Sequence, residues 1–279
     1  MSAIRLIGRL DIKGPNLIKG IQLEGLRVIG DPNQFALSYY RQGIDELLYI
    51  DAVASLYGRN SLLEVVECTT HDIFVPVTVG GGIRSIDDIH HLLRAGADKV
   101  AINTAAIARP NLIAEAAAAF GSQCIVVSIA AKRRPEGGWE AYVEGGRERT
   151  GVEAVSWAEE AVRLGAGELL ITSVDREGGQ RGYDVDLVRA IAEHSPVPVI
   201  ASGGAGNADH LIDVIRSGKA DAVAVATVLH FGKSTVVELK RALSEQDIPV
   251  RDAAEVDMTY SRSIGNNHWC RGTTLWQPP

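Results

Sequence analysis

The sequence predicts an α/β protein, a (β/α)8 TIM barrel built from two half-barrel repeats, and three observations support this prediction. Short apolar runs alternate with amphipathic segments along most of the chain, as strands and helices do in barrels of parallel strands. A glycine cluster follows an apolar run once in each half of the sequence. The chain has 279 residues, a length that suits one large barrel.

Eight apolar runs, rich in β-branched residues, have the length of buried parallel strands. They span residues 4–10, 46–51, 75–79, 99–103, 124–129, 168–173, 197–201 and 221–226. Helical periodicity is clearest at residues 34–42, 86–95, 154–164 and 207–217. A doubly wound open sheet is the structural alternative, but such a sheet usually carries one glycine-rich turn rather than two.

Two connections are longer than the turns of a barrel require. Residues 13–31 follow the first predicted strand and residues 131–151 follow the fifth. Both connections leave the carboxyl end of a strand, where barrel enzymes build their active sites. Residues 252–279 show little periodicity, and we expect them to form an irregular extension outside a barrel made by residues 1–251.

The two halves of the chain repeat one another in sequence. Residues 75–82 are echoed by residues 197–204, and residues 93–104 by residues 215–227. The second and sixth predicted strands also resemble each other. A fold with two such units offers two anion sites, which suits a ligand phosphorylated at both ends.

The glycine clusters and the polar residues after the next strand in each half are candidate phosphate-binding groups. Glycines lack a Cβ atom, so their backbone N–H groups can approach an anion, and the following helix N-terminus adds a favourable dipole. The alternative is a pair of tight strand-to-helix turns that bind nothing. The candidates are Gly81, Gly82, Asn103, Thr104, Gly203, Gly204 and Thr227.

The first predicted strand carries a candidate general acid or base. Side chains alternate along a strand, so Arg5, Ile7, Arg9 and Asp11 share one face. If that face lines the barrel lumen, Asp11 lies at the carboxyl-end mouth, where a carboxylate can transfer protons. The alternative for Asp11 is an N-cap or a salt bridge in a loop.

Four charged residues fall near the starts of the first, second, fourth and sixth predicted strands. Arg5, Glu46, Lys99 and Glu168 supply two positive and two negative charges. An alternating ring across the lumen would pair all four, as buried charges require. Ordinary strand ends that face solvent are the alternative.

The composition restricts the class of protein. The net charge of −7 and the pI of about 5.5 argue against a general nucleic-acid binder. No apolar run approaches the ~20 residues of a membrane span, and the first residues lack the layout of a signal peptide. We therefore expect a soluble cytoplasmic protein. We expect no cofactor and no metal, because the seven histidines lack paired ligand spacing.

Several motifs together identify a resemblance. The chain resembles the cyclase subunit of imidazole glycerol phosphate synthase, of histidine biosynthesis, and the likeness covers about residues 4–251. The motifs are Leu10-Asp11-Ile12-Lys13, Lys19-Gly20, Gly30-Asp31-Pro32, Gly80-Gly81-Gly82-Ile83, Ile102-Asn103-Thr104, Gly145-Gly146-Arg147, Gly182-Tyr183-Asp184 and Ala201-Ser202-Gly203-Gly204.

The resemblance implies a lyase that works as one subunit of a heterodimeric glutamine amidotransferase. In that family a class I glutaminase docks on the bottom of the barrel and releases ammonia. The ammonia crosses a charged gate, travels through the lumen as a channel and attacks a ribulose-phosphate nucleotide at the top. The products are imidazole glycerol phosphate and an aminoimidazole carboxamide ribotide.

The resemblance also implies roles for single residues. Arg5, Glu46, Lys99 and Glu168 would form the ammonia gate, and Asp45 and Asp98 would lie in the glutaminase interface. Asp11 would be one of two catalytic aspartates. The substrate and its phosphates would be bound by Lys19, Gly81, Gly82, Asn103, Thr104, Thr172, Asp175, Gly203, Gly204 and Thr227.

Three departures from the family pattern concern the predicted active site. The family's second catalytic Asp is replaced by Ala130, within Ile129-Ala130-Ala131-Lys132-Arg133. Alanine cannot transfer a proton, and loss of a general acid or base typically costs ~10²–10⁴-fold in rate. Arg9 replaces a small residue beside Asp11, and the first loop differs at Gly14-Pro15-Asn16.

Because of these departures, functions other than the family's cyclisation are also consistent with the sequence. A paralogous branch, associated with amidination of sugars in surface-polysaccharide biosynthesis, would route ammonia to a different acceptor. A catalytically impaired barrel would bind a bisphosphate and activate the glutaminase. The sister isomerase of the same pathway is also a two-phosphate repeat, but it needs no ammonia channel, so the four charged residues argue against it.

Overall fold

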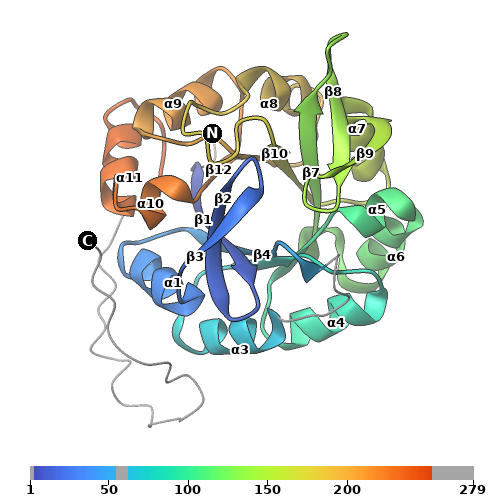
Figure 1. Ribbon diagram of the computed structural model, residues 1–279, viewed down its shortest axis with the longest axis horizontal. Helices are drawn as coiled ribbons and strands as arrows, with labels where there is room; N and C mark the ends of the chain where they lie inside the picture. The colour runs from blue at the N-terminus through green and yellow to red at the C-terminus, as the bar shows by residue number, and fades with distance from the viewer. Residues whose placement is uncertain (1–2, 55–61, 253–279) are drawn as a thin grey trace.

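A closed barrel of eight parallel strands, surrounded by helices, forms the centre of the protein (Figure 1). The computed structural model describes residues 3–54 and 62–252. The barrel strands are β1 (Arg5–Lys13), β4 (Glu46–Asp51), β5 (Val77–Gly80), β6 (Lys99–Ile102), β7 (Ile125–Arg133), β10 (Glu168–Ser173), β11 (Val199–Ser202) and β12 (Ala222–Val225). Each strand pairs with the next, and β12 pairs with β1. The predicted fold class is confirmed.

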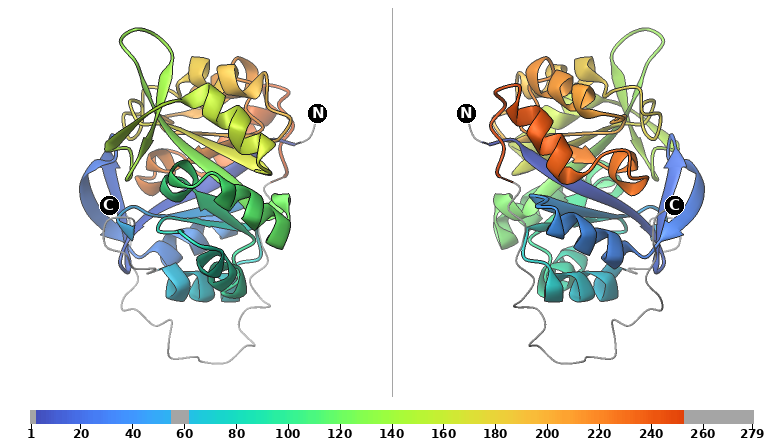
Figure 2. Two further views of the ribbon diagram at one scale, coloured as in Figure 1. Left: turned by 90° about the vertical axis from the view of Figure 1, so that its right-hand side faces the viewer. Right: turned by 90° about the vertical axis from the view of Figure 1, so that its left-hand side faces the viewer.

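The helices of the described residues pack around the outside of this barrel (Figures 1 and 2). They are α1 (Pro32–Arg41), α3 (Leu62–Asp72), α4 (Ile86–Arg94), α5 (Thr104–Ala108), α6 (Asn111–Phe120), the 3-10 turn η1 (Ser122–Cys124), α7 (Ala154–Arg163), α8 (Val185–Ala192), α9 (Ala208–Arg216), α10 (Thr227–His230) and α11 (Val236–Ser244). Side-chain caps fix where several begin. Ser85 and Asp88 form a capping box on α4, and Thr235 and Glu238 form one on α11.

The two long connections are β-hairpins, a structure that the sequence does not predict. The first consists of β2 (Asn16–Ile21) and β3 (Glu24–Gly30), and β2 pairs antiparallel with the end of β1. The second consists of β8 (Trp139–Val143) and β9 (Glu148–Glu153), which continue from β7. Both grow from strands that run past the barrel rim, so antiparallel pairing continues where parallel pairing stops. Figure 2 shows both hairpins projecting beyond the ring of helices.

The apolar core has two separate layers. A large layer lies between the outer face of the sheet and the helices, and includes Leu6, Leu47 and Leu239. A small layer fills the lumen and consists of Ile7, Leu48, Ala101, Val126, Leu170, Ile200, Ala222 and Ala224. The lumen is therefore apolar in its middle section, as barrel interiors usually are.

The half-barrel repeat predicted from the sequence extends to hydrogen bonds. The Asp98 carboxylate accepts a bond from the N–H of Val77 at 2.8 Å, and Asp221 accepts one from Val199 at 2.9 Å. Each pair joins the start of one strand to the turn before the next. In both halves an aspartate thus accepts the hydrogen bond from the first N–H of the preceding strand.

The barrel is complete within the described residues. Ile4 forms a parallel bridge with Val250, and its N–H donates to the Pro249 carbonyl at 2.7 Å. The predicted irregular extension, residues 252–279, lies outside the described residues except for Asp252. Within the described ranges, every helix is too short or too polar to cross a membrane.

Candidate active site

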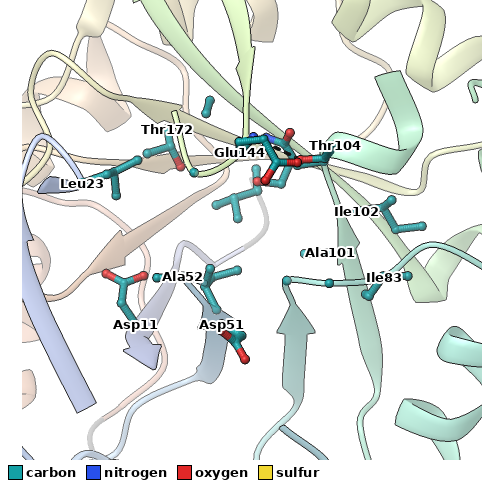
Figure 3. A pocket seen from close by; sticks show the side chains of 18 of the residues that line it. Asp11, Leu23, Asp51, Ala52, Ile83, Ala101, Ile102, Thr104, Glu144 and Thr172 are labelled. Atoms are coloured by element: carbon teal, nitrogen blue, oxygen red, sulfur yellow. Dashed lines mark hydrogen bonds between the residues drawn. The ribbon is translucent and has the colours of Figure 1, made fainter. Parts of the chain in front are cut away.

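A cavity of about 490 Å³ opens at the carboxyl ends of the barrel strands (Figure 3). The β2–β3 hairpin and the turn between β8 and β9 contribute to its walls. Asp11 and Thr172 lie on one side of the close-up, and Thr104 and Glu144 lie beside each other across from Asp11. The lining includes Arg9, Asp11, Lys19, Ile50, Asp51, Gly81, Gly82, Arg84, Ala101, Asn103, Thr104, Arg109, Ser128, Ala130, Glu144, Arg147, Leu170, Thr172 and Glu177.

Asp11 is held by two cations. Nε of Arg9 donates to Asp11 Oδ1 at 2.9 Å, and Nζ of Lys19 lies 3.4 Å from Oδ2. Arg9 also donates from Nη1 to Ser202 Oγ at 2.8 Å and to Thr172 Oγ1 at 3.2 Å. The guanidinium therefore ties β1 to β10 and β11 across part of the lumen.

The charges in this cluster decide the ionisation of Asp11. Burial by itself would raise the pKa of Asp11, but the positive charges of Arg9 and then Lys19 outweigh it and lower the pKa. Burial also opposes the charged form of Lys19, yet the carboxylates of Glu177 and Asp11 raise the pKa of Lys19 above its usual value. Asp11 is thus an ion-paired carboxylate, poorly suited to donate a proton.

Ala130 occupies the predicted second catalytic position and carries no group that can transfer a proton. It is 6% exposed, lines the cavity and pairs in register with Thr172 of β10. Around it stand the hydroxyls of Ser128 and Thr172. The site therefore contains one of the two carboxylates that the resemblance implied.

The predicted glycine cradles have matching backbone geometry. Gly81 and Gly203 have φ angles of +102° and +91°, values that L-residues with side chains rarely adopt. A Cβ on Gly81 would lie 2.4 Å from the Asp51 carbonyl oxygen, and a Cβ on Gly203 would lie 2.8 Å from that of Ser173. Asp51 and Ser173 end equivalent strands, so both turns exclude side chains for the same reason.

The two cradles differ in the space around them. Gly81, Gly82, Asn103 and Thr104 line the large cavity. The second cradle lines a separate and smaller space. Its walls are Arg9, Glu177, Gly178, Ser202, Gly203, Gly204, Ala205, Ala224, Ala226 and Thr227. The two cradles thus share their backbone geometry but line different spaces.

At the amino end of the barrel the four predicted charges form a closed ring. Arg5 donates to Glu46 at 2.8 Å and also to Glu168. Lys99 closes the ring, with Nζ 3.1 Å from Glu46 and 2.9 Å from Glu168. Each residue is the first of its strand, so the ring spans β1, β4, β6 and β10. Every charge has two partners of opposite sign.

The apolar lumen lies between this ring and the cavity. Ala101 and Leu170 belong both to the lumen layer and to the lining of the cavity. The two ends of the barrel are thus joined through apolar side chains, with the charged ring at one end and Asp11 at the other.

Comparison with known proteins agrees with this arrangement. The model of the family described as histidine biosynthesis protein matches residues 5–235. The chain belongs to this family. It is also 59% identical over 206 residues to the imidazole glycerol phosphate synthase subunit HisF of Legionella pneumophila, an alignment that covers 74% of this chain and 97% of that protein.

Asp45 and Asp98 were predicted to lie in the glutaminase interface, and Asp175 was predicted to bind substrate. The three residues differ in their exposure and in their hydrogen bonds. Asp45 is buried, and its oxygens accept bonds from the N–H of Leu6 at 2.8 Å and from Lys240 at 2.7 Å. Asp98 is exposed at the amino end of the barrel. Asp175 is exposed, does not line the cavity and accepts a bond from the N–H of Arg133 at 2.9 Å.

Some cavity residues of this family member were missed by sequence reasoning. Asp51 is the last residue of β4. Its place at the carboxyl-end mouth of the barrel could therefore have been inferred in the same way as that of Asp11. No comparable local signal marked Glu177, because its contact with Lys19 joins residues 158 positions apart. The other charged residues of the lining that were not predicted are Arg84, Arg109, Glu144 and Arg147.

Proposed function

We propose that this chain is the ammonia-accepting barrel subunit of a glutamine amidotransferase and delivers ammonia to a phosphorylated small molecule. The observation that carries the proposal is the closed ring of Arg5, Glu46, Lys99 and Glu168 at one end of an apolar lumen that meets the cavity at its other end. The name of the Legionella relative, a subunit of a synthase, supports a complex with a second protein.

The chemistry of ammonia suits this path. Neutral ammonia can cross an apolar lumen. Transfer of ammonium into the same low-dielectric medium is unfavourable, because the charge must lose its hydration. A partner glutaminase docked at the amino end would release ammonia next to the ring, and the exposed Asp98 carboxylate would be available for that contact. The ring would then admit ammonia by opening one of its ion pairs, while the apolar lumen beyond it opposes the passage of ammonium.

The residues of the cavity also bear on which molecule accepts the ammonia. Imidazole formation by paired carboxylates needs one group to give a proton while its partner takes one. Here Ala130 has no such group, and Asp11 is paired with Arg9 and Lys19. We therefore favour an acceptor other than the ribulose-phosphate nucleotide, as in sugar amidination. Activation of the glutaminase without any transfer is the second candidate, supported by the same loss of a carboxylate.

A nitrogen-tracing experiment tests these functions in the complete complex. The full chain is combined with a class I glutaminase and [amide-¹⁵N]glutamine in a large excess of ¹⁴N-ammonium, and phosphorylated acceptors are analysed by mass spectrometry. Transfer of ¹⁵N undiluted by the bulk pool supports ammonia routing. Label in imidazole glycerol phosphate would identify the family's cyclisation, and label in an amidinated sugar the other branch. Stimulated hydrolysis without labelled acceptor would identify an activator.

Substitution in the ring adds a second test of the route. Lys99→Met should lower glutamine-dependent transfer while transfer from high external ammonium persists, because ammonia in bulk can enter from the open cavity. Lys219→Met is the matched control, since Lys219 makes a surface pair with Glu193 at 2.9 Å, outside the ring. Equal losses with both nitrogen sources would contradict a gating role for the ring.

A further inference from the structure

An exposed aromatic side chain lies at the amino end of the barrel. Across the part of the chain that the structure describes, the large apolar side chains that are exposed belong to Ile21, Val28, Phe74 and Phe231. Ile21 and Val28 lie on the β2–β3 hairpin and Phe231 follows α10, so these three are at the carboxyl end. Phe74 follows α3 and precedes β5, which places it at the amino end, and it is the most exposed of the set, at 78%.

Phe74 lies beside the charged ring, because the chain enters β5 between two strands of that ring. β5 pairs with β4 on one side and with β6 on the other, and Glu46 and Lys99 are the first residues of those strands. The N–H of Leu47 donates to the Pro76 carbonyl at 3.0 Å, so the segment before β5 runs next to Glu46. Phe74 is two residues before Pro76, a span of at most ~7 Å.

The Phe74 ring is supported from the side of the barrel. The preceding residue, Ile73, is buried, so the chain directs Phe74 outwards. The ring of the buried Tyr40 packs edge-on against Phe74, with the ring centroids 6.4 Å apart and the planes at 65°. The Tyr40 carbonyl in turn accepts a bond from the N–H of Gly43 at 2.9 Å. An aromatic side chain that is already held in place loses little conformational freedom when a partner covers it.

The position of Phe74 distinguishes it from an ordinary exposed apolar residue, which by itself has no functional meaning. A partner that delivers ammonia to the ring must cover the ring and exclude water around it. A standard interface buries ~800 Å² on each partner, a disc of roughly 16 Å in radius. An interface of this size over the ring reaches Phe74. Aromatic side chains inside such interfaces contribute a large share of the binding energy.

The carboxylates predicted for this interface leave room for another anchor. Asp45 is 3% exposed and is paired with Lys240, so it is not available to a partner. Asp98 is exposed, but its Oδ2 already accepts the bond from Val77. Exposed charges of this kind affect the rate of association more than the affinity. The affinity therefore needs an apolar contact, which Phe74 can supply.

We propose that Phe74 is the apolar anchor of the glutaminase interface and inserts into an apolar pocket that lies beside the ammonia outlet of the partner. A second copy of this chain on the same face would instead close the ring off from any source of ammonia. The inference rests on the proposed function in taking a glutaminase to dock at the amino end of the barrel.

Calorimetric titration of the full chain with the class I glutaminase of the nitrogen-tracing experiment tests this inference. We expect Phe74→Ala to weaken the complex by at least about tenfold, as loss of an interface anchor does. Phe231→Ala is the matched control: it removes the same side chain from a site that is 55% exposed at the carboxyl end, and the affinity should stay unchanged. Equal affinities for the parent and Phe74→Ala would overturn the proposal.

Fluorine spectra locate the contact with the Phe74 side chain kept in place. The phenylalanines of the chain are Phe35, Phe74, Phe120 and Phe231. In the full chain labelled with 4-fluorophenylalanine, the signal lost in Phe74→Ala and the signal lost in Phe231→Ala assign these two residues. Unlabelled glutaminase should shift the Phe74 signal with saturation and protect it from a soluble paramagnetic agent, while the Phe231 signal is unaffected. A Phe74 signal that stays accessible in the saturated complex would contradict the proposal.

These readouts separate the inference from the proposed function. A complex that transfers ¹⁵N while Phe74 stays accessible would remove the inference and keep the function. Binding through Phe74 without ¹⁵N transfer would keep the interface and remove ammonia routing, and the absence of any complex with the parent would overturn both. Sedimentation of the chain alone tests the second copy as occupant: self-association that is lost in Phe74→Ala would overturn the assignment to a glutaminase.

Discussion

Nε of Arg9 donates to Oδ1 of Asp11 at 2.9 Å, within one strand and with both side chains buried in the barrel. The two residues are neighbours on the lumen face because side chains alternate along β1. This contact makes Asp11 part of a charge network with Lys19 and Glu177 rather than a free acid or base. The network, together with Ala130, determines which chemistry the cavity can perform.

Restoring the family's second carboxylate should restore little activity. We expect neither the parent nor Ala130→Asp to form imidazole glycerol phosphate from the ribulose-phosphate nucleotide at high ammonium and alkaline pH. A carboxylate at position 130 would stand next to Thr172, within the hydrogen-bond network of Arg9, and would form an ion pair instead of transferring protons. Chromatographic detection of the ribotide product measures the rate.

Further variants identify the cause of that low activity. Arg9→Cys combined with Ala130→Asp removes the competing cation. Activity should rise in this double variant, by up to the ~10²–10⁴-fold that acid–base groups contribute. Rapid turnover by Ala130→Asp alone would show that the Arg9 network does not restrain catalysis.

The charged ring should contribute to stability as well as to ammonia transfer. Glu168→Gln leaves Arg5 and Lys99 with one carboxylate between them, and we expect a loss of about 3 kcal/mol in the free energy of unfolding. Glu160→Gln is the control, because Glu160 pairs with Arg163 on the exposed surface of α7 and its loss should cost clearly less than that of Glu168. Urea unfolding of both variants gives the comparison, and similar losses would argue against a buried ring.

The close turn at Gly81 should tolerate no side chain. Gly81 and Gly137 share a φ of +102°, but a Cβ on Gly81 would clash with the Asp51 carbonyl oxygen at 2.4 Å, while nothing lies within 4 Å of one on Gly137. Gly137→Ala should therefore cost about 1 kcal/mol for the strained φ alone. Gly81→Ala should cost clearly more and weaken phosphate binding. Equal unfolding free energies would mean that the clash is relieved at no cost.

The sequence predicted the barrel well because its signal is local and repeated. The runs at residues 46–51 and 168–173 match β4 and β10 at both ends, since apolar strands bounded by glycines and charges have clear limits. The same alternation placed Arg5, Ile7, Arg9 and Asp11 on the lumen face, where the structure has them. The hairpins were missed because their strands are polar on the exposed side and short.

The candidate site could be predicted only in part, because its contacts join distant parts of the chain. The glycine repeat indicated two equivalent cradles, and their backbones are indeed alike at Gly81 and Gly203. The difference between them comes from the β2–β3 hairpin, which brings Lys19 against Glu177. Neither the pairing of that hairpin nor the burial of Asp45 by Lys240 is encoded in any short motif.

Acidic pH should destabilise the fold through His230. Its ring is buried on α10, its Nδ1 lies 2.6 Å from the Tyr39 hydroxyl, and burial and then the charge of Lys19 lower the pKa of His230 to about 3. The unfolded chain, with a histidine pKa near 6.5, takes up the proton first, so stability falls as pH drops from about 6.5 towards 3. The slope from this residue approaches about 1.4 kcal/mol per pH unit. His230→Gln should lose this slope, whereas His194→Gln, at an exposed site, should keep it. Urea unfolding between about pH 4.5 and 7.5 measures all three, and parallel curves for parent and His230→Gln would show that His230 is not the group that titrates.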